Sequence, residues 1–407
     1  MMRAFRVRTD TRIAPFLEPP RELFVATRSI DEWQRRAVER TGLSLVDVPT
    51  LDEIPDADRP AVVFFDDVFF TEVTLRNFIA EAMGEKDDVA LALPDGGTWS
   101  MLGPASDAPA CEGGHRFDLF HLTKSARWSG RDALRAATRP CFVRALERSF
   151  PIRLPRVEGS KEEANATLTL RIAAHVRHWL HVLRLSHLAI GVLLAEEVRA
   201  HPWRFFVNRR LLGRRGVSLA RASSFVHPSA EIHPTADLEG AIIGPDCRVR
   251  AHAHVHYSVL GREVSIGDHA VVMGCTLADR VQVLRASYLA LCAAMPGGTL
   301  ANYKVQLSLF GRDVFLTSSA WLLDAKLKGG SIRIEHEGKL IPIESAFLGS
   351  CLGHAVTLGA QVSLAPGRSV PNGATLVGPV EHVVSKVPSE LPSEVLTISD
   401  GKLTPIS

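Results

Sequence analysis

The chain has 407 residues, which suggests two or three domains, and 46% of them are apolar, enough to bury a large core. Its 47 basic and 45 acidic residues leave a net charge of +2, so overall charge gives no drive toward nucleic acid and no nucleic-acid partner is expected. Six scattered cysteines without a CxxC pair are typical of reduced, buried thiols rather than of disulfides or a zinc site.

The chain opens with MMRAFRVRTD, which lacks the apolar stretch of a signal peptide. No uncharged apolar run is long enough to span a membrane, so no transmembrane helix is predicted. With the cysteine usage, these features indicate a cytoplasmic protein.

Residues 1–155 alternate predicted strands and helices and are taken as an α/β domain. Residues 24–49 fit a strand, a helix and a strand. The segment 61–70, AVVFFDDVFF, fits a buried strand, followed by a helix over 71–84 and a strand over 88–94. Such a βαβ unit predicts a parallel sheet.

Two aspartates, Asp66 and Asp67, are predicted at a strand end of this sheet. Ligand sites in α/β sheets lie beyond the carboxyl ends of the strands. Asp66 and Asp67 are therefore candidates to contact substrate. The other interpretation is a strand-end cap or a solvated turn.

Residues 156–224 are interpreted as a helical and basic linker, with one long helix over 161–200. This helix carries four histidines. They are His175, His178, His181 and His187. No acidic or cysteine partner stands beside them, which favours a structural face over a metal site. The segment 201–216 is basic and aromatic, so it either covers the first coil of the next domain or touches an anionic membrane surface.

From residue 225 an aliphatic residue recurs every six positions, with steps of five between sets of three. The anchors begin with Val226, Ile232, Leu238, Ile243, Val249, Val255, Leu260, Ile266 and Val272. The pattern resumes at Phe310, Leu316 and Leu322, where Leu327 follows Phe310 by seventeen, and ends with Leu352, Leu358, Leu364, Val370 and Leu376. One inward residue per short strand and three strands per coil predict a parallel β-helix, because stacked coils bury a continuous core. The alternative, a β-sandwich, would alternate by two.

Glycines often follow these anchors, as at Gly244, Gly261 and Gly311, and are predicted near bends with unusual backbone angles. The six-residue step is broken at 286–306 and again at 328–348, which indicates two insertions. Residues 385–407 are assigned to a C-terminal tail.

Pieces such as VHPSAEIHPTAD, VLGREVSIGDHAVV and CLGHAVTLGAQVSLAPGRSVPNGATLV over residues 225–384 resemble the hexapeptide-repeat, left-handed β-helix family. An α/β domain before such a β-helix resembles bifunctional sugar-1-phosphate nucleotidyltransferase/acetyltransferases. The resemblance implies a left-handed coil, a homotrimer, a nucleotide sugar or sugar phosphate as substrate, and a role in cell-envelope synthesis. In the bifunctional enzymes a strand ends in an aspartate that helps to hold the metal, so the resemblance also implies Mg²⁺ as an alternative ligand of Asp66 and Asp67.

The first domain departs from the nucleotidyltransferase pattern. Those enzymes open with a glycine-rich phosphate loop, whereas the first 50 residues here contain one glycine, Gly42. Backbone N–H groups need such glycines to approach phosphate closely. The domain is therefore expected to be a degenerate, nucleotidyltransferase-like relative.

In the acyltransferases of this family, a histidine in a groove between coils acts as general base, and the acyl group comes from acetyl-CoA or another acyl thioester. That implication, with the two predicted insertions, points to His336 and His354 as catalytic candidates. The stretch ANYKVQLSLFGRDVFL resembles the family's acceptor-binding segment and points to Asn302, Tyr303 and Lys304 as substrate contacts.

Further histidines lie on the predicted coils and are interpreted as solvated rim residues. They are His227, His233, His252, His254 and His256. A zinc-dependent β-helix hydratase would need three histidines from adjacent coils around one ion, and no such set is assigned, so no metal ligands are predicted there. Two hypotheses follow from the sequence: an acyltransferase for a sugar nucleotide, or a non-catalytic scaffold or regulatory protein that binds one.

Overall fold

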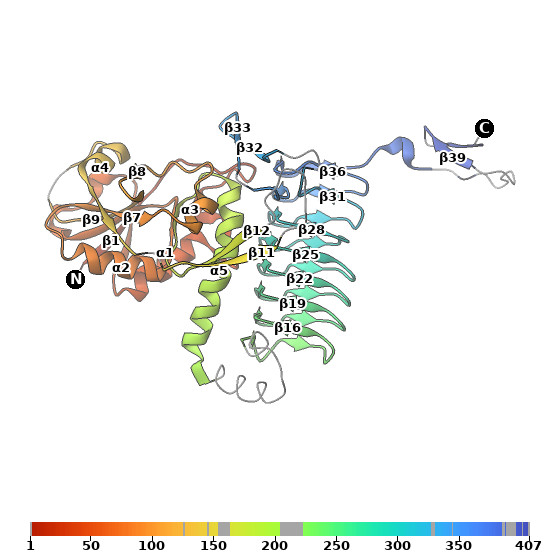
Figure 1. The fold of residues 1–407 in the computed structure, drawn as a ribbon, viewed down its shortest axis with the longest axis horizontal. Helices are drawn as coiled ribbons and strands as arrows, with labels where there is room; N and C mark the ends of the chain where they lie inside the picture. Colours follow the sequence, from red (N-terminus) through yellow and green to blue (C-terminus); the bar gives the residue numbers. More distant parts are fainter. Residues whose placement is uncertain are drawn as a thin grey trace.

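The computed structural model describes residues 2–124, 127–144, 146–153, 163–203, 223–326, 330–343, 345–384, 387, 396–400 and 402–405. The molecule consists of an N-terminal α/β half and a C-terminal β-helix, with one long helix, α5, standing between them (Figure 1). All six cysteines are free and all but Cys111 are buried, as the sequence predicted.

The N-terminal half is built on a sheet with the strand order β10-β7-β9-β5-β1-β4, and β8 pairs with β9. Its strands are β1 (Arg3–Val7), β4 (Ser44–Val48), β5 (Ala61–Phe65), β7 (Val89–Pro94), β8 (Ala110–Cys111), β9 (Gly114–Leu122) and β10 (Arg139–Phe142). The expected parallel sheet is only partly right, because β9 runs antiparallel to both β5 and β7. Its helices are α1 (Ile30–Arg40), α2 (Glu72–Ala82), α3 (Gly97–Leu102) and α4 (Arg131–Ala137), with short 3₁₀ turns at Pro20–Glu22, Leu51–Glu53 and Asp56–Asp58.

The two aspartates interrupt the strand expected over 61–70. β5 ends at Phe65, Asp66 and Asp67 form a turn, and β6 (Val68–Phe70) leaves the sheet to pair with β13 (Ala173–His175). Likewise, the strand expected near residue 24 is a two-residue hairpin, β2 (Phe24–Val25) with β3 (Arg28–Ser29), outside the main sheet. The aspartates therefore lie at the carboxyl end of β5, beside the carboxyl end of β1.

The helix predicted over 161–200 begins only at Trp179. Before it lie β12 (Glu163–Leu168), paired with β11 (Arg148–Arg153), and then β13. Helix α5 (Trp179–Ala200) is apolar and long enough to cross a membrane by length and composition, but most of it is buried. It packs on β2 and α3 on one side and on β23, β26 and β29 of the β-helix on the other. Burial on two sides explains an apolar helix without any membrane.

The β-helix consists of three parallel sheets. The helix-facing sheet contains β14 (Phe225–Val226), β17 (Ile242–Ile243), β20 (Val259–Leu260), β23 (Thr276–Leu277), β26 (Ala293–Ala294), β29 (Leu309–Phe310), β34 (Cys351–Leu352) and β37 (Ser369–Val370). The second sheet contains β15 (Glu231–Ile232), β18 (Arg248–Val249), β21 (Ser265–Ile266), β24 (Gln282–Val283), β27 (Thr299–Leu300), β30 (Phe315–Leu316), β35 (Thr357–Leu358) and β38 (Thr375–Leu376). The third sheet contains β16 (Asp237–Glu239), β19 (His254–His256), β22 (Val271–Met273), β25 (Tyr288–Ala290) and β28 (Val305–Gln306), beyond which β31 (Trp321–Leu322) pairs with β36 (Ser363–Leu364).

The predicted anchors fill the interior. Ile266, Leu277 and Leu316 have no exposed surface and belong to one apolar cluster that runs along the coils. Each coil pairs in register with the next, as Val249 does with Ile266 and Ile266 with Val283. The six-residue spacing therefore identified the fold and its core. Leu327, which the same pattern selected, lies outside the described residues.

The first predicted insertion, 286–306, is not an insertion. Residues in it form β25, β26, β27 and β28, all in register with the coils before them. The aliphatic step fails there because small Ala294 takes the anchor position that Leu277 holds one coil earlier, and because the next coil is one residue shorter, so that Leu289 pairs with Val305. In the second segment the chain does leave the coil, as an antiparallel hairpin of β32 (Arg333–His336) and β33 (Lys339–Pro342). After the last coil come a 3₁₀ turn at Val380–His382 and the hairpin of β39 (Leu396–Ser399) and β40 (Lys402–Pro405).

The glycines that follow anchors serve the stacking of coils rather than unusual backbone angles. A Cβ built on Gly244 would lie 2.2 Å from the carbonyl oxygen of Gly261, one coil away. The positive φ angles fall instead on turn residues such as Asp246 (57°) and Glu263 (57°). These glycines do stand beside turns, as Gly244 precedes the turn at 245–246, but the expected unusual backbone angles were wrong, because close approach of two backbones is what requires glycine here.

Candidate functional site

The β-helix meets the N-terminal half at the carboxyl edge of its sheet, where α/β proteins hold ligands. A single apolar cluster joins the two halves and includes Phe16, Leu183 and Leu309. The segment after β1 reaches the β-helix directly, since Asn372 donates to the Phe16 carbonyl oxygen at 2.7 Å and the Phe16 ring lies 5.0 Å from that of His354.

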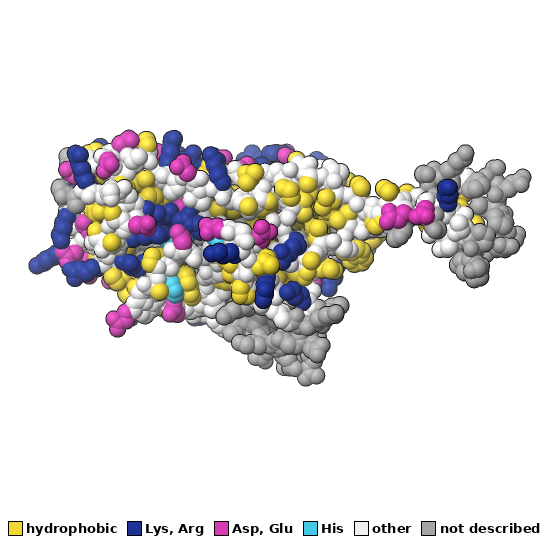
Figure 2. All heavy atoms as spheres, turned by 90° about the horizontal axis from the view of Figure 1, so that it is seen from above, with side chains coloured by type: hydrophobic (Ala, Val, Ile, Leu, Met, Phe, Trp, Pro, Cys, Tyr) yellow, Lys and Arg dark blue, Asp and Glu magenta, His cyan; other side chains and the backbone are white. Residues whose placement is uncertain are grey.

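An open cleft of about 420 Å³ lies at this junction. Its lining residues are Glu18, Arg21, Glu22, Ser29, Asp31 and Arg312. Arg21 comes from the N-terminal half and Arg312 from the turn after β29. In the view of Figure 2, charged side chains gather over the N-terminal half, while apolar ones cover much of the β-helix near the tail. The cleft is therefore a charged space formed by both halves.

Arg312 and His354 form the β-helix wall of this junction. Arg312 forms an ion pair with Glu18 and donates to the Glu22 carbonyl oxygen at 3.0 Å. The Arg312 backbone N–H donates to His354 Nδ1 at 2.9 Å, while His354 Nε2 lies 3.3 Å from the Glu18 carboxylate. A neutral imidazole that accepts at Nδ1 carries its proton at Nε2. As placed, His354 is therefore a donor toward Glu18 rather than a proton acceptor. Burial and the neighbouring Arg312 lower the pKa of His354 although Glu18 opposes them.

Asp66 lies behind the cleft with only 1% of its surface exposed. Its Oδ1 accepts hydrogen bonds from the Thr9 backbone N–H at 3.0 Å and from the Thr9 hydroxyl at 2.7 Å. Arg21 approaches the other oxygen at 3.7 Å. Burial and the adjacent Asp67 raise the pKa of Asp66, against the Thr9 hydrogen bonds.

Asp67 has no exposed surface and is paired with two arginines. Arg131 contacts its two oxygens at 2.7 and 2.9 Å, and Arg177, just before α5, pairs with Oδ2. Burial alone would raise the pKa of Asp67, but Arg131 and Arg177 outweigh it and hold the pKa below its ordinary value.

These contacts extend into a group that we call the buried charge cluster. Its members are Asp67, Asp118, Arg131, Arg135 and Arg177. Asp118, on β9, is 2% exposed and pairs with Arg131 and Arg135. The nearby His175 accepts from the Asp118 backbone N–H at 3.0 Å, so its Nδ1 carries the proton that faces Asp107 at 2.8 Å.

Mg²⁺ does not fit the two aspartates in this arrangement. The ion needs several oxygen ligands with near-octahedral geometry. Both oxygens of Asp67 already accept guanidinium N–H groups, and Oδ1 of Asp66 accepts two hydrogen bonds from Thr9. The arginines take the place that a cation would need, which agrees with the missing glycine-rich loop.

His336 lies on the β32–β33 hairpin near the start of α5, where its ring is 5.7 Å from that of His178. Within the described part of the chain its ring makes no hydrogen bond, and the nearest carboxylate, Glu337, is 4.0 Å away. His178 and His181 are buried structural residues, as the sequence favoured. His178 caps α5, and His181 lies 2.8 Å from the Pro104 carbonyl oxygen.

The three predicted acceptor contacts lie apart from the cleft lining. Asn302 is 2% exposed and donates to the carbonyl oxygens of Thr317 and Ala320, at 3.2 and 2.8 Å. Its carbonyl oxygen accepts from the Lys304 backbone N–H at 3.0 Å, so the Asn302 amide joins adjacent coils. Tyr303 is 64% exposed and Lys304 is also exposed. Their roles as substrate contacts stay predictions.

Sequence reasoning missed Glu18, Arg21 and Arg312. No local sequence signal identifies these residues, because they line the cleft only when the two halves of the molecule pack together. Arg177 lay inside the predicted helix, so its pairing with Asp67 could not be seen either. The repeat could place Arg312 on an outer turn, but not toward the N-terminal half.

Comparison with known proteins gives limited similarity. No family model and no curated protein matches the chain. Three solved structures from Caulobacter crescentus, each in complex with CoA and GDP-perosamine, are similar to part of the chain: two variants of perosamine N-acetyltransferase and the protein PerB. A histidine-to-asparagine variant is 20% identical over 43% of this chain and 62% of its own, with a TM-score of 0.21. A histidine-to-alanine variant is 18% identical over 42% of this chain and 60% of its own, with a TM-score of 0.15. The PerB structure at 1.0 Å resolution is 20% identical over 42% of this chain and 61% of its own, with a TM-score of 0.17.

This chain thus spans about six tenths of the length of those acetyltransferases. At such low similarity the comparison carries no argument about activity. The β-helix is established by the strand pairing described above. The nucleotidyltransferase-like character of the N-terminal half stays a prediction.

Proposed function

We propose that this chain is a transferase that acts on a sugar nucleotide or sugar phosphate, whose phosphate binds in the cleft between the two halves. The observation that carries the proposal is the convergence of Arg21 and Arg312, from different halves, on one open charged cleft. Arginine suits phosphate because its planar N–H groups match two phosphate oxygens. Both arginines are paired with carboxylates in this structure, Arg312 with Glu18 and Arg21 with Asp66 at 3.7 Å, so a bound phosphate must displace these carboxylates. His354 supports this binding, since its Nε2–H lies beside Arg312 and would add a further donor once Glu18 moves aside.

The transferred group is an acyl group from acetyl-CoA or another acyl thioester. A general base takes a proton from the acceptor amine or hydroxyl, the freed nitrogen or oxygen attacks the thioester carbonyl, and the thiol leaves with a proton. Of the two candidates, His336 suits the base better, because its ring has no hydrogen bond within the described residues whereas His354 is held as a donor. His336, Tyr303 and Lys304 do not line the cleft, so the acceptor group must extend away from the cleft-bound phosphate to reach them; Tyr303 and Lys304 are exposed.

The second candidate is a non-catalytic scaffold that binds a nucleotide sugar. The pairing of Asp67 with Arg131 and Arg177 favours it for the N-terminal half, because no carboxylate oxygen of Asp67 is left for a metal. Both candidates share the cleft, so binding and transfer must be tested separately. A homotrimer and a cytoplasmic location are part of the proposal. The predicted membrane contact through 201–216 stays a prediction, because most of that segment lies outside the described residues.

Binding is tested by calorimetric titration of the full chain with UDP-, GDP-, CDP- and dTDP-sugars and with a sugar 1-phosphate. The variants Arg21→Ala and Arg312→Ala should each weaken binding roughly 10–100-fold, as expected for losing a hydrogen bond to a charged group. Arg312→Lys should restore part of it. Arg248→Ala, an exposed arginine on the second sheet, is the matched control and should leave affinity unchanged. Equal ligand affinities in all variants would exclude the cleft as the phosphate-binding site.

Transfer is tested by following thiol release from acetyl-CoA in the presence of each ligand that binds. Loss of a positioned general base typically lowers the rate by ~10²–10⁴-fold, so His336→Ala should do so while His233→Ala, an exposed histidine on a turn, should not. Binding without thiol release would support the scaffold. Thiol release that survives His336→Ala would remove His336 as the base.

A further inference from the structure

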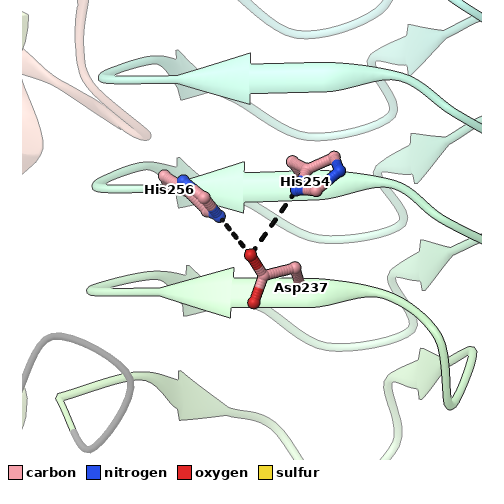
Figure 3. Close-up of side chains that lie close together, drawn as sticks. All are labelled: Asp237, His254 and His256. Atoms are coloured by element: carbon pink, nitrogen blue, oxygen red, sulfur yellow. Dashed lines mark hydrogen bonds and ion pairs between the residues drawn. The ribbon is translucent and has the colours of Figure 1, made fainter. Parts of the chain in front are cut away.

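Three potential metal ligands meet on the outer face of the third sheet, far along the β-helix from the predicted site residues. His254 and His256 are two apart on β19 and point to the same side, with Val255 between them buried in the core (Figure 3). Asp237 lies on β16, one coil away, in register with His254. Two strands of one sheet therefore fix the positions of all three side chains.

The three side chains converge on one point. Asp237 Oδ2 lies 3.0 Å from His256 Nε2 and 3.5 Å from His254 Nδ1. The three ligand atoms all lie within 4.8 Å of one another. Ligands ~2.0–2.1 Å from a tetrahedral zinc ion lie ~3.3 Å apart, so small side-chain rotations would bring all three to binding distance.

From this geometry we infer that Asp237, His254 and His256 form a binding site for a divalent transition-metal ion of the zinc class. Two imidazoles and one carboxylate favour Zn²⁺, Co²⁺ or Ni²⁺ over Mg²⁺ and Ca²⁺, which prefer oxygen ligands. Among the residues that the structure describes, these three protein ligands leave one tetrahedral position open. The side chains of His254, His256 and Asp237 are 49%, 23% and 23% exposed, so that position is within reach of water or an anion.

The charge of the three ligands suits an ion as well. One carboxylate and two neutral imidazoles leave a bound Zn²⁺ with a net charge of +1, which favours water, hydroxide or an anionic ligand at the open position. The zinc-hydratase hypothesis required three histidines from adjacent coils. Here an aspartate takes the place of one of them, and the ligands come from two neighbouring coils. This site is independent of the cleft and of the proposed transferase function.

The test uses the full chain without a polyhistidine tag, stripped with EDTA and then dialysed. Titration with Co²⁺, followed by optical absorbance and by displacement with Zn²⁺, should show one bound ion per chain. The variants His256→Ala and Asp237→Ala should each weaken binding by more than the ~10–100-fold that losing an outer hydrogen-bond partner of a ligand costs. Circular dichroism should show unchanged folding, because the three positions are on the surface.

The matched control is His252→Ala. His252 is an exposed histidine on the same coil, and it stacks on His269 at 5.0 Å rather than on the proposed ligands. Binding that persists in His252→Ala and is lost in His256→Ala supports the site. Absence of binding by the unaltered chain, equal binding by His256→Ala, or loss of binding in His252→Ala would each overturn it.

Discussion

The interior of the β-helix and the buried charge cluster are both closed to water, yet opposite residues fill them. The β-helix interior consists of aliphatic side chains such as Ile266 and Leu277, each packed on the coil above and below. The charge cluster consists of aspartates with almost no exposed surface and arginines that cover them. Apolar residues stabilise additively and locally, whereas a buried charge is tolerated only with its partners present. The two regions should therefore respond differently to substitution and to pH.

The largest effect should come from breaking the charge cluster. Asp67→Ala leaves Arg131 and Arg177 without their shared carboxylate, and loss of one partner of a buried pair costs about 3–5 kcal/mol. The measurement is the free energy of unfolding from urea titration. The control is Glu231→Ala, which removes an exposed partner of Arg248 and should change the free energy of unfolding by less than ~0.5 kcal/mol. A cost below about 1 kcal/mol for Asp67→Ala would show that the cluster is solvated.

The junction around α5 should lose stability in mild acid. Burial lowers the pKa of His181 to about 4, and burial and His181 lower that of His178 to about 3. The unfolded chain takes up these protons near pH 6.5 while the folded chain does not, so stability is complete above pH 6.5 and falls toward pH 4. At ~1.4 kcal/mol per pH unit, His181 accounts for up to about 3 kcal/mol.

Thermal unfolding measured between pH 7 and 4.5 tests this dependence. His181→Gln keeps a donor toward the Pro104 carbonyl oxygen but cannot take up a proton, so its melting temperature should fall less steeply with pH. A slope equal to that of the unaltered chain would show that His181 is not the sensitive group.

The stacking of coils should be sensitive at glycines. In Gly244→Ala the new methyl group would meet the Gly261 backbone at 2.2 Å, and forcing an extra carbon into a packed region typically costs 1–3 kcal/mol. The control is Gly84→Ala, where the nearest atom to the added carbon, the Glu81 carbonyl oxygen, is 3.4 Å away. Urea unfolding of the two variants separates backbone contact from a general effect of glycine substitution.

The smallest effect should come from trimming the apolar interior. Ile266→Val removes one methylene from a residue with no exposed surface and should cost about 0.5–1.5 kcal/mol, nearly independent of pH. The same substitution should leave ligand binding in the cleft unchanged, because Ile266 lies inside the coils. A pH-dependent loss would contradict the contrast between the two regions.

The sequence alone predicted the β-helix and its core, because every strand of every coil needs one inward aliphatic residue, and this repeats at a fixed spacing along the chain. It misjudged segment 286–306, where Ala294 replaces a larger anchor. It also predicted an unusual backbone angle at Gly244, because spacing does not show how closely two backbones approach. It also placed Asp66 and Asp67 at a strand end but could not show that Thr9, Arg131 and Arg177 already occupy them.

Tertiary structure alone decided the cleft and the metal-ligand cluster. Arg21 and Arg312 are about 290 residues apart in the chain, and they face one space only because the segment after β1 and helix α5 pack against the β-helix. Asp237 reaches His254 and His256 because one turn of the coil brings position 237 beside position 254. Repetition along the chain fixes a core from sequence, whereas a site that joins distant segments depends on how the finished elements pack.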